Sequence, residues 1–236
     1  MRLRGMSLAE IYWVRHGEAA FATDNYDRLT ARGIQQASLL GEYFQQRNIQ
    51  FDQLVSGTMI RQQHTLSLLS QSAQDMTLKA SHEQTPLANE YDFEQLTKQY
   101  ATQYPQTPLV QQWQANSSDK KLFFSLLREA LSCWSHGDLN NVDETFDGFE
   151  QRIKQLISKM QNYHGKKVLI VSSGGVISTV LGKLMQMPPT AMFELNLQMR
   201  NTGISQCFFN KKIMRVSSFN AIPHLETPNR QTLVSY

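Results

Sequence analysis

Three short apolar segments, each followed by small or polar residues and then by a helical pattern, restrict the folds open to this chain. They span residues 11–14, 51–55 and 168–171, and they contain the β-branched and aromatic residues that favour buried strands. Strand, loop and helix in alternation predict a mostly parallel sheet that helices cover on both faces. We therefore expect an α/β fold of three layers.

Apolar residues at intervals of three and four predict the helices of this fold. Such intervals occur at 34–44, 59–69, 121–134, 144–160 and 176–185. Thr30 is a suitable N-cap for the first of these helices. Two further segments, 204–209 and 213–219, have strand character, and we expect a turn at Asn210-Lys211 between them.

The length of 236 residues allows one large domain or two small ones, and no Gly/Ser-rich linker or internal repeat divides the chain. The segment from about 92 to 141 combines glutamines, aromatic residues and prolines without a strong strand pattern. We expect a single domain over residues 1–236, with a largely helical insertion at 92–141 over the active edge of the sheet. Residues that select the substrate are expected in this insertion.

Composition excludes several classes of protein. The chain has 23 Lys and Arg against 20 Asp and Glu, and a net charge of +3 is too small to indicate a nucleic-acid or anionic-membrane partner. No apolar run approaches the roughly 20 residues of a membrane span. Cys133 and Cys207 cannot build a disulfide framework and lack metal-site spacing. Arg2 and Arg4 precede no apolar stretch, unlike a signal peptide. We expect a cytoplasmic protein.

The residues of functional interest follow three of the predicted strands, where parallel sheets bind their ligands. They are Arg15-His16, the segment 56–61 and the segment 172–175. A neutral imidazole is a nucleophile, and a guanidinium offers donors in the geometry of a phosphate. A glycine-rich helix start presents backbone amides to an anion. The position of the three segments at one edge of the sheet is the first indication of a functional site.

These segments, with two further residues, resemble the histidine phosphatase superfamily, also called the phosphoglycerate mutase-like family. The matching residues are Arg15-His16-Gly17, Ser56-Gly57-Thr58-Met59-Ile60-Arg61, Thr65, Glu90 and Ser172-Ser173-Gly174-Gly175. The segment from Glu144 to Arg152 also resembles the family's helix before its late strand. The resemblance extends from Ile11 to about Ile204 and is weakest in the insertion.

The resemblance implies a role for each matching residue. His16 would be the nucleophile that forms a phosphohistidine, while Arg15 and Arg61 would bind the phosphate oxygens. Glu90 would protonate the leaving oxygen and then activate water, with Glu83 and Glu94 as alternative acids. This chemistry requires no metal or organic cofactor, because arginines and helix amides supply the positive potential.

The chain departs from the family at the late strand, where the family has Ser-His-Gly-Gly. Ser173 stands at the place of the second histidine, and Gly174 follows it. We expect both to bind phosphate, although a hydroxyl forms a weaker bond than a charged donor. Loss of one such donor typically lowers a rate about 10²–10³-fold. His64 or His82 could compensate, whereas Ser135-His136-Gly137 is expected in a surface loop.

Two hypotheses of function remain after the sequence analysis. In the first, the protein hydrolyses a phosphomonoester through phospho-His16, at a full or a reduced rate. In the second, it is a catalytically inactive phosphate-binding or regulatory protein that uses Arg15, His16 and Arg61 as an anion pocket. A mutase must protect its phosphohistidine from water, which the missing histidine hinders, so hydrolysis is favoured over isomerisation. The partner is a small phosphorylated substrate or inorganic phosphate, and the oligomeric state stays open.

Four aromatic residues in or beside the insertion have two possible uses. Tyr91, Phe93, Trp113 and Trp134 could form the wall of a site for an apolar or aromatic substrate, or they could belong to the core. The identity of the substrate is not accessible from these residues alone.

Overall fold

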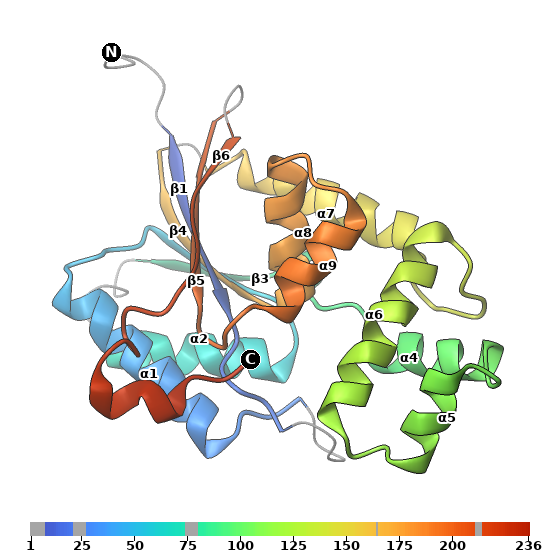
Figure 1. Ribbon diagram of the computed structural model, residues 1–236. Coiled ribbons are helices and arrows are strands. Elements are labelled where there is room, and N and C mark those ends of the chain that lie inside the picture. Colours follow the sequence, from blue (N-terminus) through green and yellow to red (C-terminus); the bar gives the residue numbers. More distant parts are fainter. Residues whose placement is uncertain (1–7, 21–26, 74–79, 164, 211–213) are drawn as a thin grey trace.

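A six-stranded mixed sheet forms the centre of the protein (Figure 1). The computed structural model describes residues 8–20, 27–73, 80–163, 165–210 and 214–236. The strands are β1 (Ala9–Arg15), β2 (Gln53–Ser56), β3 (Ser81–Gln84), β4 (Lys167–Ser172), β5 (Ile204–Phe209) and β6 (Met214–Ala221). Within the described residues their order in the sheet is β3-β2-β4-β1-β5-β6.

The sheet has a parallel and an antiparallel part. Strands β3, β2, β4 and β1 pair in parallel, whereas β5 pairs antiparallel with β1 and with β6. The three early strand segments of the sequence analysis are thus confirmed as the parallel centre of the sheet. A short connection can join only antiparallel strands, which explains the β5–β6 pair. The turn predicted there, at Asn210-Lys211, lies partly outside the described residues.

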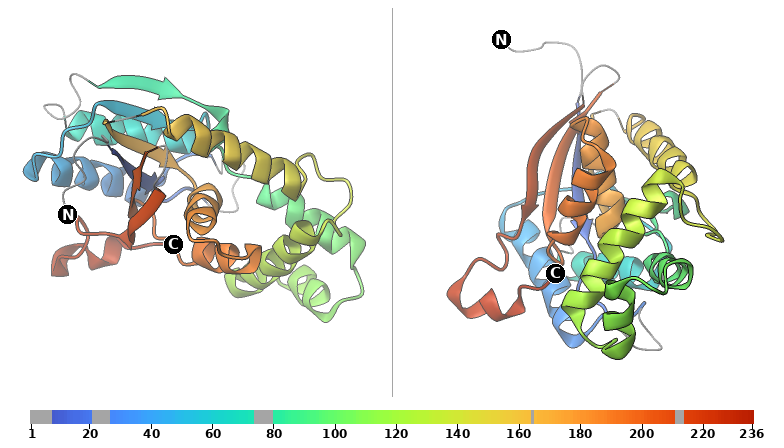
Figure 2. Two further views of the ribbon diagram at one scale, coloured as in Figure 1. Left: turned by 90° about the horizontal axis from the view of Figure 1, so that it is seen from above. Right: turned by 45° about the vertical axis from the view of Figure 1, so that its right-hand side comes forward.

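Helices cover both faces of the sheet (Figure 2). Helices α1 (Ala31–Gln46) and α2 (Ile60–Ser72) lie on one face, and α7 (Phe146–Met160) and α8 (Gly174–Leu184) lie on the other. Helix α9 (Pro189–Leu197) packs on α8. The described residues also contain two short 3₁₀ helices, η1 (Pro86–Ala88) and η2 (Pro228–Leu233).

The pleat of β1 divides the hydrophobic core into two layers. Tyr12 and Val14 pack with residues of α1 and α2, among them Leu40. Ile11 and Trp13 point to the opposite face and pack with residues of α7 and α8. Since successive side chains of a strand alternate between faces, an apolar run such as 11–14 fits a sheet buried on both sides. The predicted three-layer α/β architecture is therefore confirmed.

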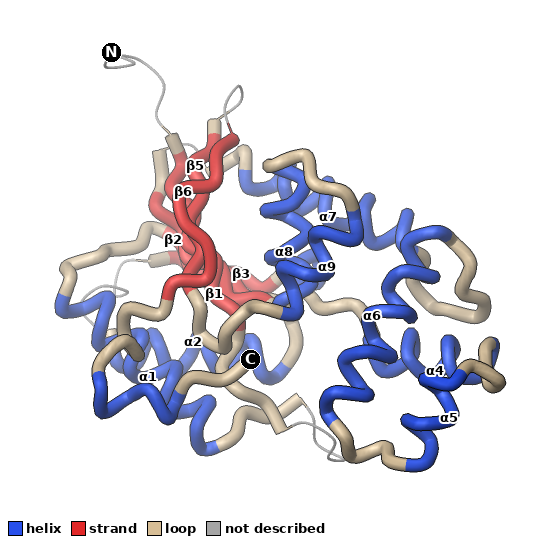
Figure 3. Tube along the Cα trace, viewed as in Figure 1, coloured by secondary structure: helices blue, strands red, loops and turns tan. Residues whose placement is uncertain are grey.

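A further group of helices lies beside the sheet (Figure 3). It consists of α4 (Phe93–Gln103), α5 (Pro108–Ala115) and α6 (Lys120–His136), which we call the cap helices; α4 and α5 both contact α6. They lie within the segment that the sequence analysis expected to be a helical insertion. Among the described residues, no helix is both long enough and apolar enough to cross a lipid bilayer.

Candidate active site

Four of the residues that the sequence analysis selected line one cavity. Its volume is about 400 Å³, and it lies where β1 ends. Arg15 ends β1 and His16 follows it, while Arg61 lies in the first turn of α2. Glu90 lies between η1 and α4 and lines the same cavity. The fold thus brings together two guanidinium groups, an imidazole and a carboxyl group.

Hydrogen bonds determine which nitrogen of His16 has a free electron pair. His16 Nδ1 lies 2.8 Å from the carbonyl oxygen of Gly17, to which it can only donate. Arg61 Nε donates to His16 Nε2 at 3.2 Å, which requires that Nε2 accept. Both contacts assign the tautomer with hydrogen on Nδ1. The nucleophilic electron pair therefore belongs to Nε2, beside the Arg61 guanidinium.

The electrostatic environment of His16 keeps its imidazole neutral. The residue is 4% exposed. Burial lowers the pKa of His16 well below its ordinary value of 6.5, and the charges of Arg61 and Arg15 lower it further. A neutral imidazole at neutral pH is the form that can attack phosphorus.

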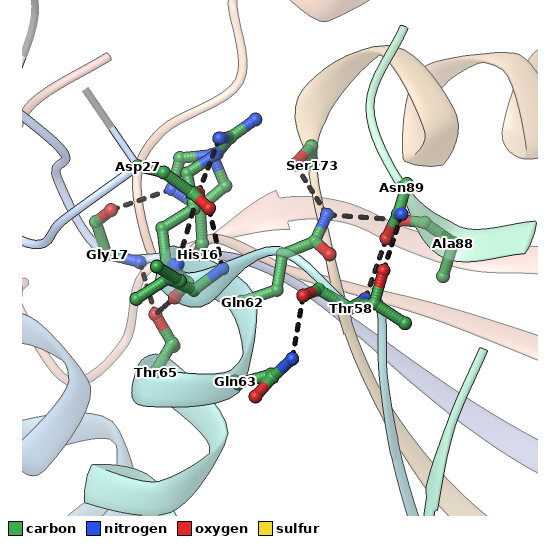
Figure 4. Close-up of polar contacts among 12 residues, drawn as sticks. His16, Gly17, Asp27, Thr58, Gln62, Gln63, Thr65, Ala88, Asn89 and Ser173 are labelled. Carbon is green, nitrogen blue, oxygen red and sulfur yellow. Dashed lines mark hydrogen bonds and ion pairs between the residues drawn. The ribbon is translucent and has the colours of Figure 1, made fainter. Parts of the chain in front are cut away.

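Arg61 is held by a carboxylate that the sequence analysis did not select. Asp27 Oδ1 forms an ion pair with Arg61 Nη1 at 2.7 Å. The Asp27 carboxylate also accepts hydrogen bonds from the backbone N–H of Ile60, at 2.8 Å, and of Arg61, at 3.3 Å. Asp27, which Figure 4 labels, thus caps the start of α2 and orients the Arg61 side chain at the same time.

The segment that precedes β5 fixes Arg15 and the backbone of His16. Arg15 Nη1 donates to the carbonyl oxygen of Met199, and the N–H of Thr202 donates to the carbonyl oxygen of Arg15 at 3.0 Å. Asn201 Nδ2 donates to the carbonyl oxygen of His16 at 3.1 Å. The end of β1 is therefore held from a segment that lies more than 180 residues later in the chain.

Glu90 has the surroundings of a proton donor. Its Oε2 accepts a hydrogen bond from the N–H of Gly175, at the start of α8, at 2.9 Å. A Cβ atom at position 175 would collide with Glu90 and Tyr91, so the close approach requires glycine there. Burial raises the pKa of Glu90 above its ordinary value of 4.5, although the Gly175 bond and the nearby arginines oppose the shift.

The alternative acids lie elsewhere among the described residues. Glu83 forms an ion pair with Lys159 and accepts a hydrogen bond from Gln53 Nε2 at 3.1 Å. Neither Glu83 nor Glu94 lines the cavity of His16. The geometry therefore favours Glu90 as the acid.

The structure does not place Ser173 and Gly174 on the wall of the cavity. Ser173 is 1% exposed, and its Oγ accepts a hydrogen bond from Gln62 Nε2 at 2.8 Å. Figure 4 shows the Gln62 side chain directed toward Ser173 and Ala88. Gly174 lies close to Arg15, since a Cβ atom there would be 3.7 Å from Arg15 Nε. Contact of Ser173 and Gly174 with phosphate stays a prediction.

No further histidine lines this cavity among the described residues. His64 and His82 line a separate depression formed by α2 and β3. His136 is exposed in the last turn of α6, where Gly137 ends the helix with a φ of 76°. The proposed compensation by His64 or His82 is therefore not supported by their positions.

The four aromatic residues in or beside the insertion do not all have the same role: two line the cavity, and two pack in or against the core. Tyr91 and Phe93 line the cavity. Trp134 is buried and packs against Phe149, with ring centroids 5.4 Å apart, and Trp113 packs against the same core. Trp134 is thus a core residue, and Trp113 is a partly buried residue at the edge of the core.

Sequence reasoning missed the residues that orient the site from a distance. Asp27, Gln62, Asn196 and Asn201 are single polar residues without a motif pattern of their own. Their partners lie 34 to 185 positions away, as the pairs Asp27–Arg61, Asn196–Tyr91, Gln62–Ser173 and Asn201–His16 show. Within the described residues, no group of three His, Cys, Asp or Glu side chains could hold a metal ion.

The chain is similar to known proteins in sequence and in fold. Residues 11–222 match the model of the histidine phosphatase superfamily (branch 1). An adenosylcobalamin/alpha-ribazole phosphatase of Escherichia coli (strain K12) is 26% identical over 194 residues, which cover 79% of this chain and 84% of that protein.

Solved structures show the same fold. The phosphoglycerate mutase of Bacillus anthracis str. Sterne superposes with a TM-score of 0.65 at 18% identity, covering 93% of this chain and 96% of that one. A phosphoserine phosphatase of Entamoeba histolytica, in complex with 3-phosphoglyceric acid, gives a TM-score of 0.63 at 20% identity, covering 92% and 99%. Since the family model matches residues 11–222 of its 236 residues, the chain belongs to the histidine phosphatase superfamily (branch 1).

Proposed function

We propose that the protein hydrolyses a small phosphomonoester through a phosphohistidine formed on His16. The observation that supports this most strongly is the pairing, in one cavity, of a neutral imidazole with a carboxyl group of raised pKa. A nucleophile must be deprotonated and an acid protonated at the same pH, and burial shifts His16 and Glu90 in these two directions.

In the first step, His16 Nε2 attacks phosphorus and the bond to the leaving oxygen breaks. The Glu90 carboxyl group gives its proton to that oxygen, and the alcohol departs. Arg61 turns from Nε2 to the phosphoryl oxygens, which Arg15 binds from the other side. Because the transition state of phosphoryl transfer is loose, charge and positioning contribute more than covalent assistance.

In the second step, water replaces the alcohol. The Glu90 carboxylate takes a proton from the water molecule. The water oxygen attacks phosphorus at the same time, and the bond between phosphorus and His16 Nε2 breaks. Inorganic phosphate leaves, His16 regains its electron pair, and Glu90 is again protonated. The net reaction consumes one ester and one water and yields one alcohol and one phosphate.

We further propose that Ser173 occupies the position of the family's second histidine. In that case Arg15 and Arg61 supply the positive charge without a third cation from residue 173. The names of two relatives support hydrolysis over a purely binding role, since one is an alpha-ribazole phosphatase and one a phosphoserine phosphatase. A protein that only binds phosphate would also have no need of a protonated carboxyl group beside a neutral imidazole.

The test is the hydrolysis of p-nitrophenyl phosphate and a panel of alkyl phosphates by the purified protein. The variant His16→Asn removes the nucleophile, and we expect its kcat/KM to fall at least about 10³-fold. His64→Asn is the matched control, because His64 lines the separate depression at α2 and β3. An unmodified protein without activity on the whole panel, or a His16→Asn variant with full activity, would contradict the proposal.

A further inference from the structure

The cavity of His16 has a second, apolar end. Side chains of the cap helices and of α9 form it: Phe93 from α4, Phe123, Phe124 and Leu127 from α6, and Leu197 from α9. Arg15, His16 and Arg61 line the cavity from the end of β1 and the first turn of α2, which we call its charged end, and Lys120 also lines the cavity, from the first residue of α6. A substrate that places its phosphoryl group at His16 therefore places its leaving group among these apolar side chains.

The two phenylalanines of α6 are less buried than the core residues of the same helix, and Phe123 packs against the edge of the core. Leu126, Leu131 and Trp134 on the same helix are at most 2% exposed, whereas Phe124 is 40% exposed. Phe123 packs edge-to-face with Phe93, with ring centroids 6.2 Å apart. Apolar surface that lines a hollow is stabilised when a ligand covers it. The wall thus has the composition of a binding surface.

The size of the cavity permits such a ligand. At about 400 Å³ it falls within the range of roughly 300–1,000 Å³ that is usual for small-molecule sites. A phosphoryl group alone fills only the charged end. The remaining space is sufficient for a leaving group that contains a ring.

The polar side chains that line the cavity bear on the charge of the leaving group. Asn196 Nδ2 donates to the Tyr91 hydroxyl at 2.8 Å, and Arg32 forms an ion pair with Glu18 at 2.9 Å. A carboxylate on the leaving group would have to replace one of these contacts or bind Lys120, which also lines the cavity. An apolar leaving group requires none of these changes.

We infer that the substrate is a phosphomonoester of an alcohol bearing an aromatic or similarly flat apolar group, which packs among Phe93, Phe123 and Phe124. This inference rests on the proposed function, since it names the leaving group of the same reaction. Rings of this kind pack edge-to-face or offset against phenylalanine, which is the geometry that Phe93 and Phe123 already adopt toward each other.

The experiment compares 2-phenylethyl phosphate with phosphoserine. Both are esters of primary alcohols, so a difference in kcat/KM reports contacts of the leaving group. We expect a preference of at least about tenfold for 2-phenylethyl phosphate, the size expected from burying a phenyl ring. Phe124→Ala should lower this preference at least threefold. Met185→Ala is the matched control, because Met185 is 44% exposed and does not line the cavity.

Calorimetric binding of both esters to His16→Asn separates this inference from the proposed function. If 2-phenylethyl phosphate binds more tightly but the unmodified protein hydrolyses neither ester, the subsite stands and the proposed function fails. An equal or greater preference for phosphoserine would overturn the subsite and indicate that Lys120 or Arg32 binds a carboxylate. A preference that Phe124→Ala and Met185→Ala change to the same extent would also overturn it.

Discussion

At the scale of single residues, His16 and Glu90 determine when the site is competent. Burial favours the uncharged form of both side chains. It therefore lowers the pKa of the His16 imidazole and raises the pKa of the Glu90 carboxyl group. The sequence could suggest these two residues, because they belong to motifs at the ends of elements. It could not give their protonation, which depends on surroundings built from distant segments.

The first prediction concerns the pH dependence of kcat/KM. The rate rises with pH as His16 loses its proton, and this limb should lie below pH 6.5 because the pKa of His16 is lowered from that value. The rate falls as Glu90 loses its proton, and this limb should lie above pH 4.5 because that pKa is raised. A profile of an alkyl phosphate measured on Glu90→Gln should lack the upper limb. Retention of that limb would assign the acid to another residue.

The second prediction concerns Ser173. Its hydroxyl accepts a hydrogen bond from the Gln62 side-chain amide at 2.8 Å, and both residues are buried. An imidazole at position 173 would therefore collide with Gln62. Ser173→His alone should destabilise the fold without raising activity. Adding Gln62→Ala should restore stability in part and raise kcat/KM above that of the single variant.

A double-mutant cycle of unfolding in urea and of phosphatase kinetics measures this coupling. Gln62→Ala alone serves as the control, since it leaves Ser173 without its partner but adds no imidazole. Additive effects of the two substitutions on stability and rate would show that the imidazole at position 173 and the Gln62 side chain do not compete for the same space.

At the scale of elements, the start of α2 combines stability with positioning. The helix has no side-chain cap of its own at Met59, and Asp27 supplies the acceptor from another segment. The strands β1, β2 and β4 and the helices α1, α2 and α8 could be predicted because their apolar residues have the right period. Strand β3 could not, because its four residues, Ser81–Gln84, lie at an edge and have no apolar face.

The third prediction separates the two roles of Asp27. Asp27→Ala removes both the cap and the charge, and it should lower the free energy of unfolding by about 1 kcal/mol, the usual worth of a cap. Asp27→Asn keeps an acceptor for the N–H of Ile60 and should cost less. Both variants should lower kcat/KM, since Arg61 loses its ion pair. Urea unfolding and steady-state kinetics test this, and an Asp27→Asn enzyme with unchanged kcat/KM would exclude a positioning role.

At the scale of the whole molecule, the C-terminal segment packs against α1 and against residues 201–202, and it contains a buried histidine. His224 is 2% exposed, and its Nε2 lies 2.8 Å from Thr202 Oγ1. Burial lowers the pKa of His224 to about 3, with a smaller contribution from Arg230. Thr202 in turn bonds the backbone of Arg15, so this packing extends to the active site.

The fourth prediction follows from that pKa. Below pH 6.5 the unfolded chain protonates at His224 while the native state does not, down to about pH 3, so stability falls as the pH falls. Between about pH 7.5 and 5.5 the free energy of unfolding should fall by about 1.4 kcal/mol more for the unmodified protein than for His224→Asn, because the unfolded chain takes up nearly one proton at His224 over this range. Urea unfolding at the two pH values measures the difference. The exposed His136→Asn is the control, and it should behave as the unmodified protein does.

The measurement that tests the central claim most directly is the capture of the phosphoenzyme. With p-nitrophenyl phosphate, whose leaving group needs no acid, Glu90→Gln should form the phosphohistidine and then hydrolyse it slowly. After rapid mixing and an alkaline quench, peptide mass spectrometry should find one phosphoryl group on His16. Acid should release this group, and the double variant Glu90→Gln/His16→Asn should lack it. Product formation without a phosphoenzyme, or phosphate on another residue such as Ser173, would contradict the account.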